Sequence, residues 1–363
     1  RWNGWFLHYQ DGKKSKMKKN LFGLMEEAIR EEMAPFDIQP FRTNQLVEWM
    51  YGKSAKSFDE MTNISQDLRY RLAREFSIDR ARQVERWDST DGKTTKFLLG
   101  FPDEVAVESV LMRQPYGNSV CISTQAGCAM GCAFCASTLK GLTRDLVAGE
   151  MLAQVFFIND YLMKAGQKVD TMVLMGSGEP LYNYANVLQF LRLIHEPYCL
   201  NFGYRNVTLS TCGIVERIYD LAHQKLQVGL AISLHAPNDE IRRRLMPIAN
   251  KYPIKDVVKA GEVYFNATGR RVTYEYILID GVNDSKENAR ELGHLLQGQN
   301  ASVNLIPINP VVERYLHRPN DGKVKDFANI LHSMHITATV RKEMGADINA
   351  ACGQLRNRHL EGK

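Results

Sequence analysis

The sequence predicts an α/β fold built around a parallel sheet, and three observations support this prediction. From Ser119 to residue 343, apolar runs typical of strands alternate with helical patterns in six strand–helix units and a last strand. Residues 21–80 have the pattern of short helices, and residues 81–118 have the pattern of β strands. We therefore expect a helical accessory domain, a β-hairpin extension and then a larger α/β domain.

Composition and charge exclude several classes of protein. The 363 residues are 44% hydrophobic and 24% charged, which is typical of a globular protein and not of a disordered one. No apolar run is long enough for a membrane helix, and the first charged residues precede no signal-like apolar segment. Seven cysteines, three of them clustered, indicate cytoplasmic thiol chemistry and not a disulfide scaffold.

Residues 1–20 form a basic head. They hold six Lys or Arg and one Asp, whereas the rest of the chain holds 40 basic and 40 acidic residues, so the head accounts for the net charge of +5. The overall charge therefore gives little support for nucleic-acid binding, although a local basic patch could provide it. We interpret residues 1–20 as a loose polar arm or as a non-native start, because position 1 is Arg and Met17 is a candidate first residue.

The accessory domain, residues 21–80, begins with the helical pattern LFGLMEEAIREEM at residues 21–33. Asn63 or Ser65 is expected to cap its last helix. Its basic residues either contact RNA phosphates or form an ordinary solvated surface, and the sequence leaves both interpretations open; they are Arg42, Lys53, Lys56, Arg69, Arg71 and Arg74. In the extension, residues 81–118, apolar residues recur with a period of two around an Asp91–Gly92 hairpin turn.

The α/β domain, residues 119–343, alternates strands and helices. Strands are expected at residues 119–124, 171–175, 206–210, 228–233, 272–279, 302–306 and 336–340. Helices are expected at residues 147–164, 184–196, 214–224, 253–267, 284–297 and 322–334. The sequence contains no GxGxxG motif, so it gives no support for a dinucleotide-binding fold. Residues that follow the strands should gather at one end of the sheet, and they include Gly178, Glu179, Ser210, Ser233, His235 and Asn309.

Three cysteines, Cys128, Cys132 and Cys135, form a C-x3-C-x2-C run. Clustered thiolates bind soft metals, but a structural zinc site would need a fourth ligand, and no histidine lies nearby in the sequence. Three thiolates on a [4Fe–4S] cube would leave one iron open for a substrate or cofactor. We therefore expect a [4Fe–4S] cluster, with a degraded zinc knuckle or unligated thiols as the alternatives.

The run Gly127–Cys135 resembles the signature of radical S-adenosylmethionine (SAM) enzymes. In that superfamily SAM chelates the open iron, and an electron from the cluster cleaves it to a 5′-deoxyadenosyl radical. The resemblance implies a partial (β/α)6 radical SAM barrel for residues 119–343, and residues 344–363 would then form a C-terminal loop that carries Cys352.

Six segments are similar, in order, to the bacterial adenine-C2 RNA methyltransferases. They are residues 121–128, 135–142, 176–180, 232–238, 303–307 and 350–355. That family methylates an adenosine in the peptidyl transferase centre of 23S ribosomal RNA and the adenosine 3′ of the anticodon in tRNA. The resemblance runs from about residue 20 to residue 357.

The resemblance implies a relay between two thiols, because adenine C2 is electron-poor and cannot attack the SAM methyl group. One SAM methylates Cys352, and a second SAM gives the radical that takes a hydrogen from the S-methyl group. The methylene radical adds to C2, Glu108 accepts the C2 proton, and Cys121 attacks the Cys352 sulfur to release the product. The remaining cysteines, Cys199 and Cys212, are interpreted as structural.

By the same matching, one pocket binds both SAM molecules of a turnover in succession. Its residues are Gly178, Glu179, Ser210, Ser233, Leu234, His235 and Asn309. The implied partners are protein-free or precursor 23S rRNA, tRNA and a reductant such as flavodoxin or ferredoxin, and we expect a cytoplasmic monomer. The alternatives are an adenine-C8 methyltransferase of the same family, a non-catalytic Fe–S protein that binds RNA, and a radical SAM activase of a protein.

Overall fold

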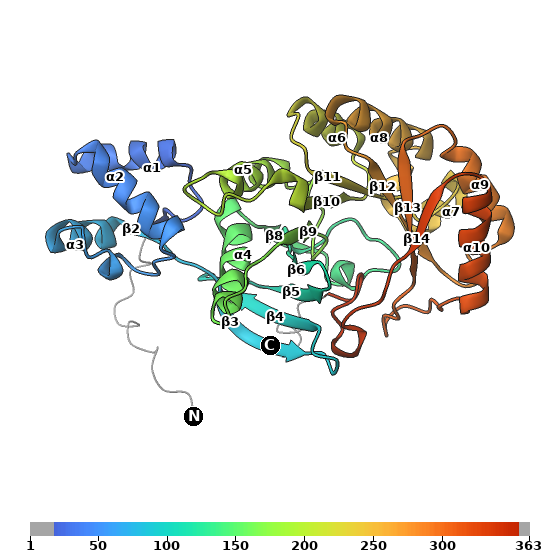
Figure 1. The fold of residues 1–363 in the computed structure, drawn as a ribbon, viewed down its shortest axis with the longest axis horizontal. Helices are drawn as coiled ribbons and strands as arrows, with labels where there is room; N and C mark the ends of the chain where they lie inside the picture. The colour runs from blue at the N-terminus through green and yellow to red at the C-terminus, as the bar shows by residue number, and fades with distance from the viewer. Residues whose placement is uncertain (1–17, 356–363) are drawn as a thin grey trace.

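The computed structural model describes residues 18–355, and its main feature is one curved sheet that runs through most of the molecule (Figure 1). Within these residues the sheet has ten strands. In spatial order they are β14 (Thr337–Val340), β13 (Ala301–Pro307), β12 (Val272–Leu278), β11 (Gly229–Ser233), β10 (Val207–Thr211), β9 (Thr171–Leu174), β6 (Gly117–Cys121), β5 (Ala106–Gln114), β4 (Thr94–Gly100) and β3 (Arg82–Asp88).

The parallel part of this sheet is the predicted partial (β/α)6 barrel. β6 pairs in parallel with β9, and each strand from β9 to β14 pairs in parallel with the next. The helices that join these strands lie along the outside of the sheet in Figure 1: α4 (Ala148–Met163), α5 (Tyr184–His195), α6 (Val215–His223), α8 (Ile254–Thr268), α9 (Lys286–Leu295) and α10 (Asp321–Ser333). The predicted strands and helices of this part are confirmed to within a few residues, whereas the sequence does not predict the short α7 (Asp239–Leu245).

The β extension is more than a separate hairpin, because its three strands continue the barrel sheet. β3 pairs antiparallel with β4, β4 with β5, and β5 with β6. The Asp91–Gly92 turn lies between β3 and β4, as predicted, and Gly92 has a φ of 67°. In β4, buried and exposed residues do not alternate. All of its residues are buried, because both faces of this strand are covered. The extension therefore brings side chains of β4 and β5 into the interior.

The accessory domain consists of short helices on one side of the barrel (Figure 1). They are α1 (Glu26–Met33), α2 (Pro40–Val47) and α3 (Gln66–Glu75), with the single turns η1 (Ala34–Phe36), η2 (Glu48–Gly52) and η3 (Phe58–Glu60). Ser65 caps α3, because its hydroxyl accepts a hydrogen bond from the Leu68 N–H at 3.4 Å. No helix in residues 18–355 is long and apolar enough to span a membrane.

One boundary prediction at the start of this domain is wrong. β1 (Lys19–Asn20), which we assigned to the polar arm, pairs in parallel with β2 (Phe76–Ser77) and closes the domain. α1 begins only at Glu26, because the residues between β1 and Glu26 form a turn against the barrel instead. The rest of the arm, residues 1–17 with Met17, lies outside the described residues.

The junction between the two domains is closely packed. An added Cβ on Gly149 of α4 would lie 2.3 Å from the Phe22 carbonyl oxygen, and one on Gly23 would lie 2.2 Å from the Gly149 Cα. The Arg80 guanidinium lies over the Phe22 and Phe156 rings at 4.5 and 4.8 Å. Two glycines in contact and a shared cation thus fix the accessory domain against α4.

Candidate active site

A cavity opens at the carboxyl ends of the barrel strands, where a parallel barrel places its functional residues. Nine of the predicted site residues line it: Cys128, Cys132, Cys135, Gly178, Glu179, Ser210, Ser233, His235 and Cys352. The short hairpin of β7 (Gln125–Gly127) and β8 (Leu142–Asp145) and the turn η4 (Ala136–Thr138) frame the three-cysteine loop. Residues at the ends of β9, β10 and β11 and in two loops therefore meet in one cavity.

The three clustered cysteines suit an iron–sulfur cluster. Burial raises the pKa of each thiol, to about 12 for Cys128, so that a metal must drive their ionisation. Between residues 18 and 355 no three His, Cys, Asp or Glu side chains are placed to hold one metal ion, as a structural zinc would require. A [4Fe–4S] cube binds each thiolate on a different iron and thus accepts more widely spaced ligands. The donor set therefore fits the cube.

Glu179 is held rigidly in the cavity wall. Its carboxylate oxygens accept hydrogen bonds from the Leu181 N–H at 2.9 Å and the Cys212 N–H at 2.7 Å. Burial raises the pKa of this carboxyl, and these backbone donors partly oppose the shift. Cys212, which the sequence assigns only a structural role, also lines the cavity. The arrangement presents one oriented acceptor to a ligand's ammonium group.

His235 is a neutral imidazole in the same wall. Its Nδ1 accepts a hydrogen bond from the Ile277 N–H at 3.0 Å, so the ring carries its proton on Nε2. Burial, followed by the nearby Arg242, lowers its pKa to about 3. His235 therefore serves as a fixed hydrogen-bond donor and not as a pH-sensitive group.

Two predicted pocket residues lie just behind the cavity lining. Leu234 is fully buried, and its carbonyl accepts a hydrogen bond from the Arg242 Nε at 3.3 Å. Asn309 is buried, and its amide donates to the Cys352 carbonyl at 3.1 Å. Asn309 thus positions the Cys352 loop, and Leu234 contributes packing and its main chain.

Cys352 lies on a loop after β14 that several contacts hold against the three-cysteine loop. The Ala136 N–H donates to the Gly353 carbonyl at 2.8 Å, and the Ser137 hydroxyl donates to the Leu355 carbonyl at 2.7 Å. On the other side, Asp347 accepts hydrogen bonds from the Thr90 N–H and hydroxyl at 2.8 and 2.7 Å. The loop therefore spans from the cluster motif to the β3–β4 turn.

Cys121 lies beneath this loop, at the end of β6. It packs in a small apolar cluster with Val110 and Leu355. Burial raises the pKa of its thiol to about 12, and Cys352 is near enough that its charge raises this pKa further. The structure thus brings together two thiols that are far apart in the sequence.

Glu108 lies on β5, two residues before Val110, the partner of Cys121 in the sheet. Its carboxylate is buried and pairs with the Lys96 ammonium at 3.0 Å. The same ammonium donates to the Asn349 carbonyl at 3.2 Å, on the loop that carries Cys352. The sequence does not predict a role for Lys96, because its contacts with Glu108 and Asn349 depend on how distant segments pack.

Sequence reasoning also missed two charged residues that line the cavity, the half-buried Arg341 and the buried Glu275. Arg341 follows β14 directly, and its Nη1 lies 3.9 Å from an oxygen of Glu275 on β12. The other Glu275 oxygen accepts a hydrogen bond from the Asn304 amide at 3.0 Å. Charge on Cys352 and, less strongly, on Glu275 raises the pKa of Arg341. An acid inside the apolar run VTYEYILI is the one signal that the sequence offered.

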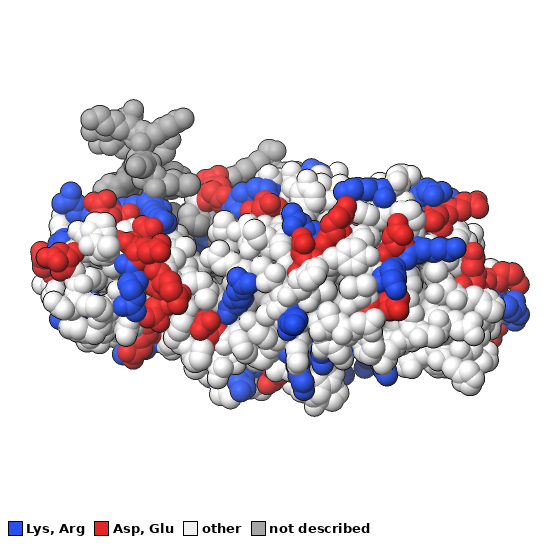
Figure 2. All heavy atoms as spheres, turned by 90° about the horizontal axis from the view of Figure 1, so that it is seen from above, with Lys and Arg blue, Asp and Glu red and all other residues white. Residues whose placement is uncertain are grey.

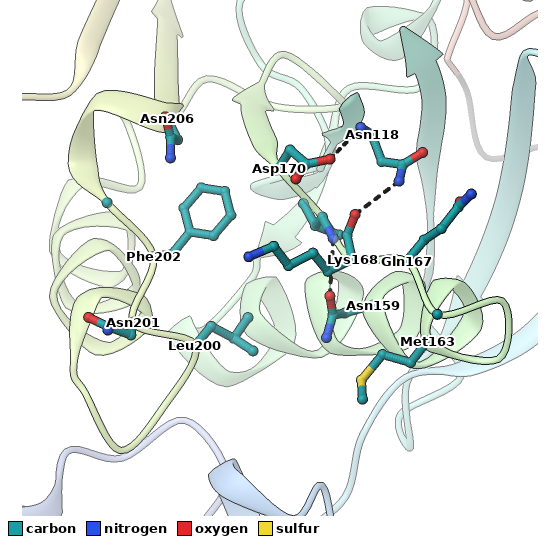
Figure 3. A pocket seen from close by; sticks show the side chains of 13 residues that line it. Asn118, Asn159, Met163, Gln167, Lys168, Asp170, Leu200, Asn201, Phe202 and Asn206 are labelled. Carbon is teal, nitrogen blue, oxygen red and sulfur yellow. Dashed lines mark hydrogen bonds between the residues drawn. The ribbon is translucent and has the colours of Figure 1, made fainter. Parts of the chain in front are cut away.

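A second pocket lies away from this chemistry, at the opposite ends of β6 and β9 (Figure 3). Carboxamides, the exposed Lys168 and the Phe202 ring line it, and the Asn118 N–H donates to Asp170 at 2.7 Å. It contains none of the predicted site residues, so the cavity with the three cysteines is the candidate active site.

This three-thiol loop at the mouth of a partial barrel, facing a carboxylate and a neutral histidine, defines a radical SAM enzyme. The model of the Radical SAM superfamily matches residues 122–293. The model of the ribosomal RNA large subunit methyltransferase N-terminal domain matches residues 19–78. The chain belongs to the RlmN family of dual-specificity RNA methyltransferases, as the following relatives show.

The relatives match over nearly the whole chain. The probable dual-specificity RNA methyltransferase RlmN of Clostridium perfringens is 47% identical over 345 residues, which are 95% of this chain and 99% of that protein. The protein of the same name from Symbiobacterium thermophilum is 51% identical over 94% of this chain and 92% of its own length. The crystal structure of a radical SAM methyltransferase from Sphaerobacter thermophilus superposes with a TM-score of 0.90 at 43% identity, covering 93% of this chain and 99% of that one.

Proposed function

We propose that this enzyme methylates C2 of adenosine in 23S ribosomal RNA and in tRNA, with Cys352 as the carbon carrier. The observation that carries the proposal is the position of Cys352, which lines the same cavity as the three clustered cysteines and lies near Cys121. The name of the relatives, dual-specificity RNA methyltransferase, supports two kinds of RNA substrate.

The cofactors supply chemistry that side chains cannot. Bound at the three cysteines and along the wall with Glu179, the cluster and SAM provide a methyl donor and a 5′-deoxyadenosyl radical. The chain's own contribution is to orient and to protect. Glu179 offers an oriented acceptor, and His235 offers a fixed donor.

The two thiols divide the remaining work. The Cys352 sulfur takes up the methyl carbon. Once a hydrogen atom has been removed from that carbon, the carbon forms the bond to adenine C2, and the adduct gives up one electron, which the oxidised cluster would accept. The Glu108 carboxylate, which pairs with the Lys96 ammonium, accepts the C2 proton. Attack of the Cys121 sulfur on the Cys352 sulfur then breaks the bond between the Cys352 sulfur and the carbon, the carbon takes up a proton to become the methyl group of the product, and a disulfide forms. Electrons from a reductant such as flavodoxin or ferredoxin return the thiols to their reduced state.

The test is Cys352→Ala, with Cys199→Ala as the matched control because Cys199 lies outside the cavity. Anaerobically reconstituted Cys352→Ala should keep the cluster absorbance but form no methyladenosine on protein-free 23S transcript or tRNA. The control should methylate both RNAs. Methylation by Cys352→Ala at the control's rate would exclude the relay.

The same assay separates the alternatives, because mass spectrometry of the nucleosides distinguishes 2-methyladenosine from 8-methyladenosine. An adenine-C8 enzyme would give only the second product, and a non-catalytic RNA-binding protein would give neither. We infer a monomer in the cytoplasm, where both RNAs occur, and size-exclusion chromatography with light scattering tests the monomer.

A further inference from the structure

The loop between β13 and α10, residues 309–318, presents two large apolar side chains to solvent. The Tyr315 side chain is 94% exposed and that of Val312 is 89% exposed, more than any other large hydrophobic residue in the described part of the chain. We call residues 309–318 the rim loop. Two large apolar side chains exposed three positions apart on one loop form a candidate contact surface.

The rim loop is anchored beside the carbon-carrying thiol. Asn309 donates to the Cys352 carbonyl at 3.1 Å, and the Gln354 amide donates to the Pro310 carbonyl at 3.1 Å. Arg314 donates to the Thr138 hydroxyl at 3.2 Å, on the turn that follows the three cysteines. These three contacts hold Tyr315 near the entrance to the cavity.

Uncommitted positive charge surrounds the same entrance. Lys140 follows the turn that receives Arg314, and Arg243 and Arg244 precede Leu245, whose carbonyl accepts the Ala133 N–H at 2.9 Å. These three side chains are exposed, and none has an ion-pair or hydrogen-bond partner in residues 18–355. A polyanion is therefore the complementary partner for this entrance.

The accessory domain has fewer basic side chains without a protein partner. Most of its basic side chains already contact protein groups, namely Arg42, Lys53, Lys56, Arg69 and Arg71. On the face shown in Figure 2, Lys and Arg are interspersed with Asp and Glu, with no large field of one sign. This contrast favours the rim loop over a purely electrostatic surface for recognition of the reacting nucleotide.

We propose that the Tyr315 ring stacks on the base that neighbours the target adenosine, an inference that rests on the proposed function. An enzyme that reacts at a base must take that base out of its stack, which leaves the neighbouring base without a partner on one face. An exposed aromatic ring at the entrance replaces the lost stacking, whichever base is present. The cations Lys140, Arg243 and Arg244 then contact the flanking phosphates.

The test compares Tyr315→Ala and Tyr315→Phe with Tyr70→Ala, a control in an exposed tyrosine of α3. The probe is an unmodified transcript of the peptidyl transferase region of 23S rRNA. Tyr315→Ala should raise the Kd of the transcript about tenfold, because stacking on an aromatic ring contributes that much per base. Tyr315→Phe and Tyr70→Ala should stay within about twofold of the parent enzyme.

A second readout separates this proposal from the proposed function. In the proposed relay SAM methylates Cys352 before RNA takes part, so S-methylcysteine should form equally in all variants, as mass spectrometry of the Cys352 peptide measures. Absence of S-methylcysteine in the parent enzyme would overturn the proposed function. If S-methylcysteine forms but Tyr315→Ala binds the transcript as the parent does, the stacking role is wrong.

Discussion

Cys121 lies deeper in the protein than Cys352, and its surroundings oppose its ionisation. Burial raises the pKa of its thiol to about 12, and Arg341 opposes this shift only in part. Because the thiolate is the nucleophile, only a small fraction of Cys121 is reactive near neutral pH. Release of the RNA is therefore the step of the relay that we expect to be most sensitive to pH.

We expect alkylation of Cys121 by iodoacetamide in the folded enzyme to rise about tenfold per pH unit from pH 7 to pH 10 without a plateau. The sign follows from the raised pKa, since the thiolate fraction keeps growing until the pH reaches that value. Mass spectrometry of the Cys121 peptide measures the rate. In urea-unfolded protein the rate should level off near pH 9, and a similar plateau in the folded enzyme would contradict the prediction.

Lys96 and Glu108 form a buried ion pair, and removing one partner should cost more than removing an exposed charge. Glu108→Gln leaves the Lys96 ammonium buried without its counter-charge, which typically costs about 3–5 kcal/mol. Asp88→Asn, in a surface pair with Arg86, should change the free energy of unfolding by less than about 1 kcal/mol. Urea unfolding of the two variants tests this difference. Equal decreases in the free energy of unfolding would show that the buried pair stabilises the protein no more than the surface pair does.

Some residues of the site could be predicted from the sequence and others could not. The three clustered cysteines, Gly178 and Glu179 lie in contiguous motifs, and their strands bring them to one end of the barrel. Lys96 and Arg341 act through groups far along the chain, as the contact of Lys96 with Asn349 shows. No local pattern records such a contact, because it depends on how separate segments pack.

At the scale of the elements, hydrophobic periodicity located the strands and helices that have a clear apolar stripe. It missed α7, whose sequence DEIRRRL is short and mostly charged. It also made the extension a hairpin beside the barrel, because alternation reveals a strand but not its neighbour in the sheet. The antiparallel pairing of β5 with β6 is what places Glu108 close to Cys121.

Helix α4 makes a close contact with the accessory domain at Gly149, and a single methyl group there should disturb it. Gly149→Ala would place a Cβ 2.3 Å from the Phe22 carbonyl oxygen, so the backbones must separate, at a cost of about 1–3 kcal/mol. Gly52→Ala is the control, because its Cβ would meet nothing closer than 3.7 Å. Thermal unfolding should show a lower Tm for Gly149→Ala alone; an unchanged Tm would mean that the junction yields easily.

For the whole molecule, the continuous sheet makes one body of the barrel and the extension, and the accessory domain is fixed against it at Gly23 and Gly149 (Figure 1). The close packing at this junction limits movement of the accessory domain relative to the barrel. An RNA that contacts both the accessory helices and the Cys352 loop must place its adenosine at the separation that this junction sets. Two RNAs of unrelated sequence meet this requirement when their folds place the adenosine at the same distance from the segment that contacts the accessory domain.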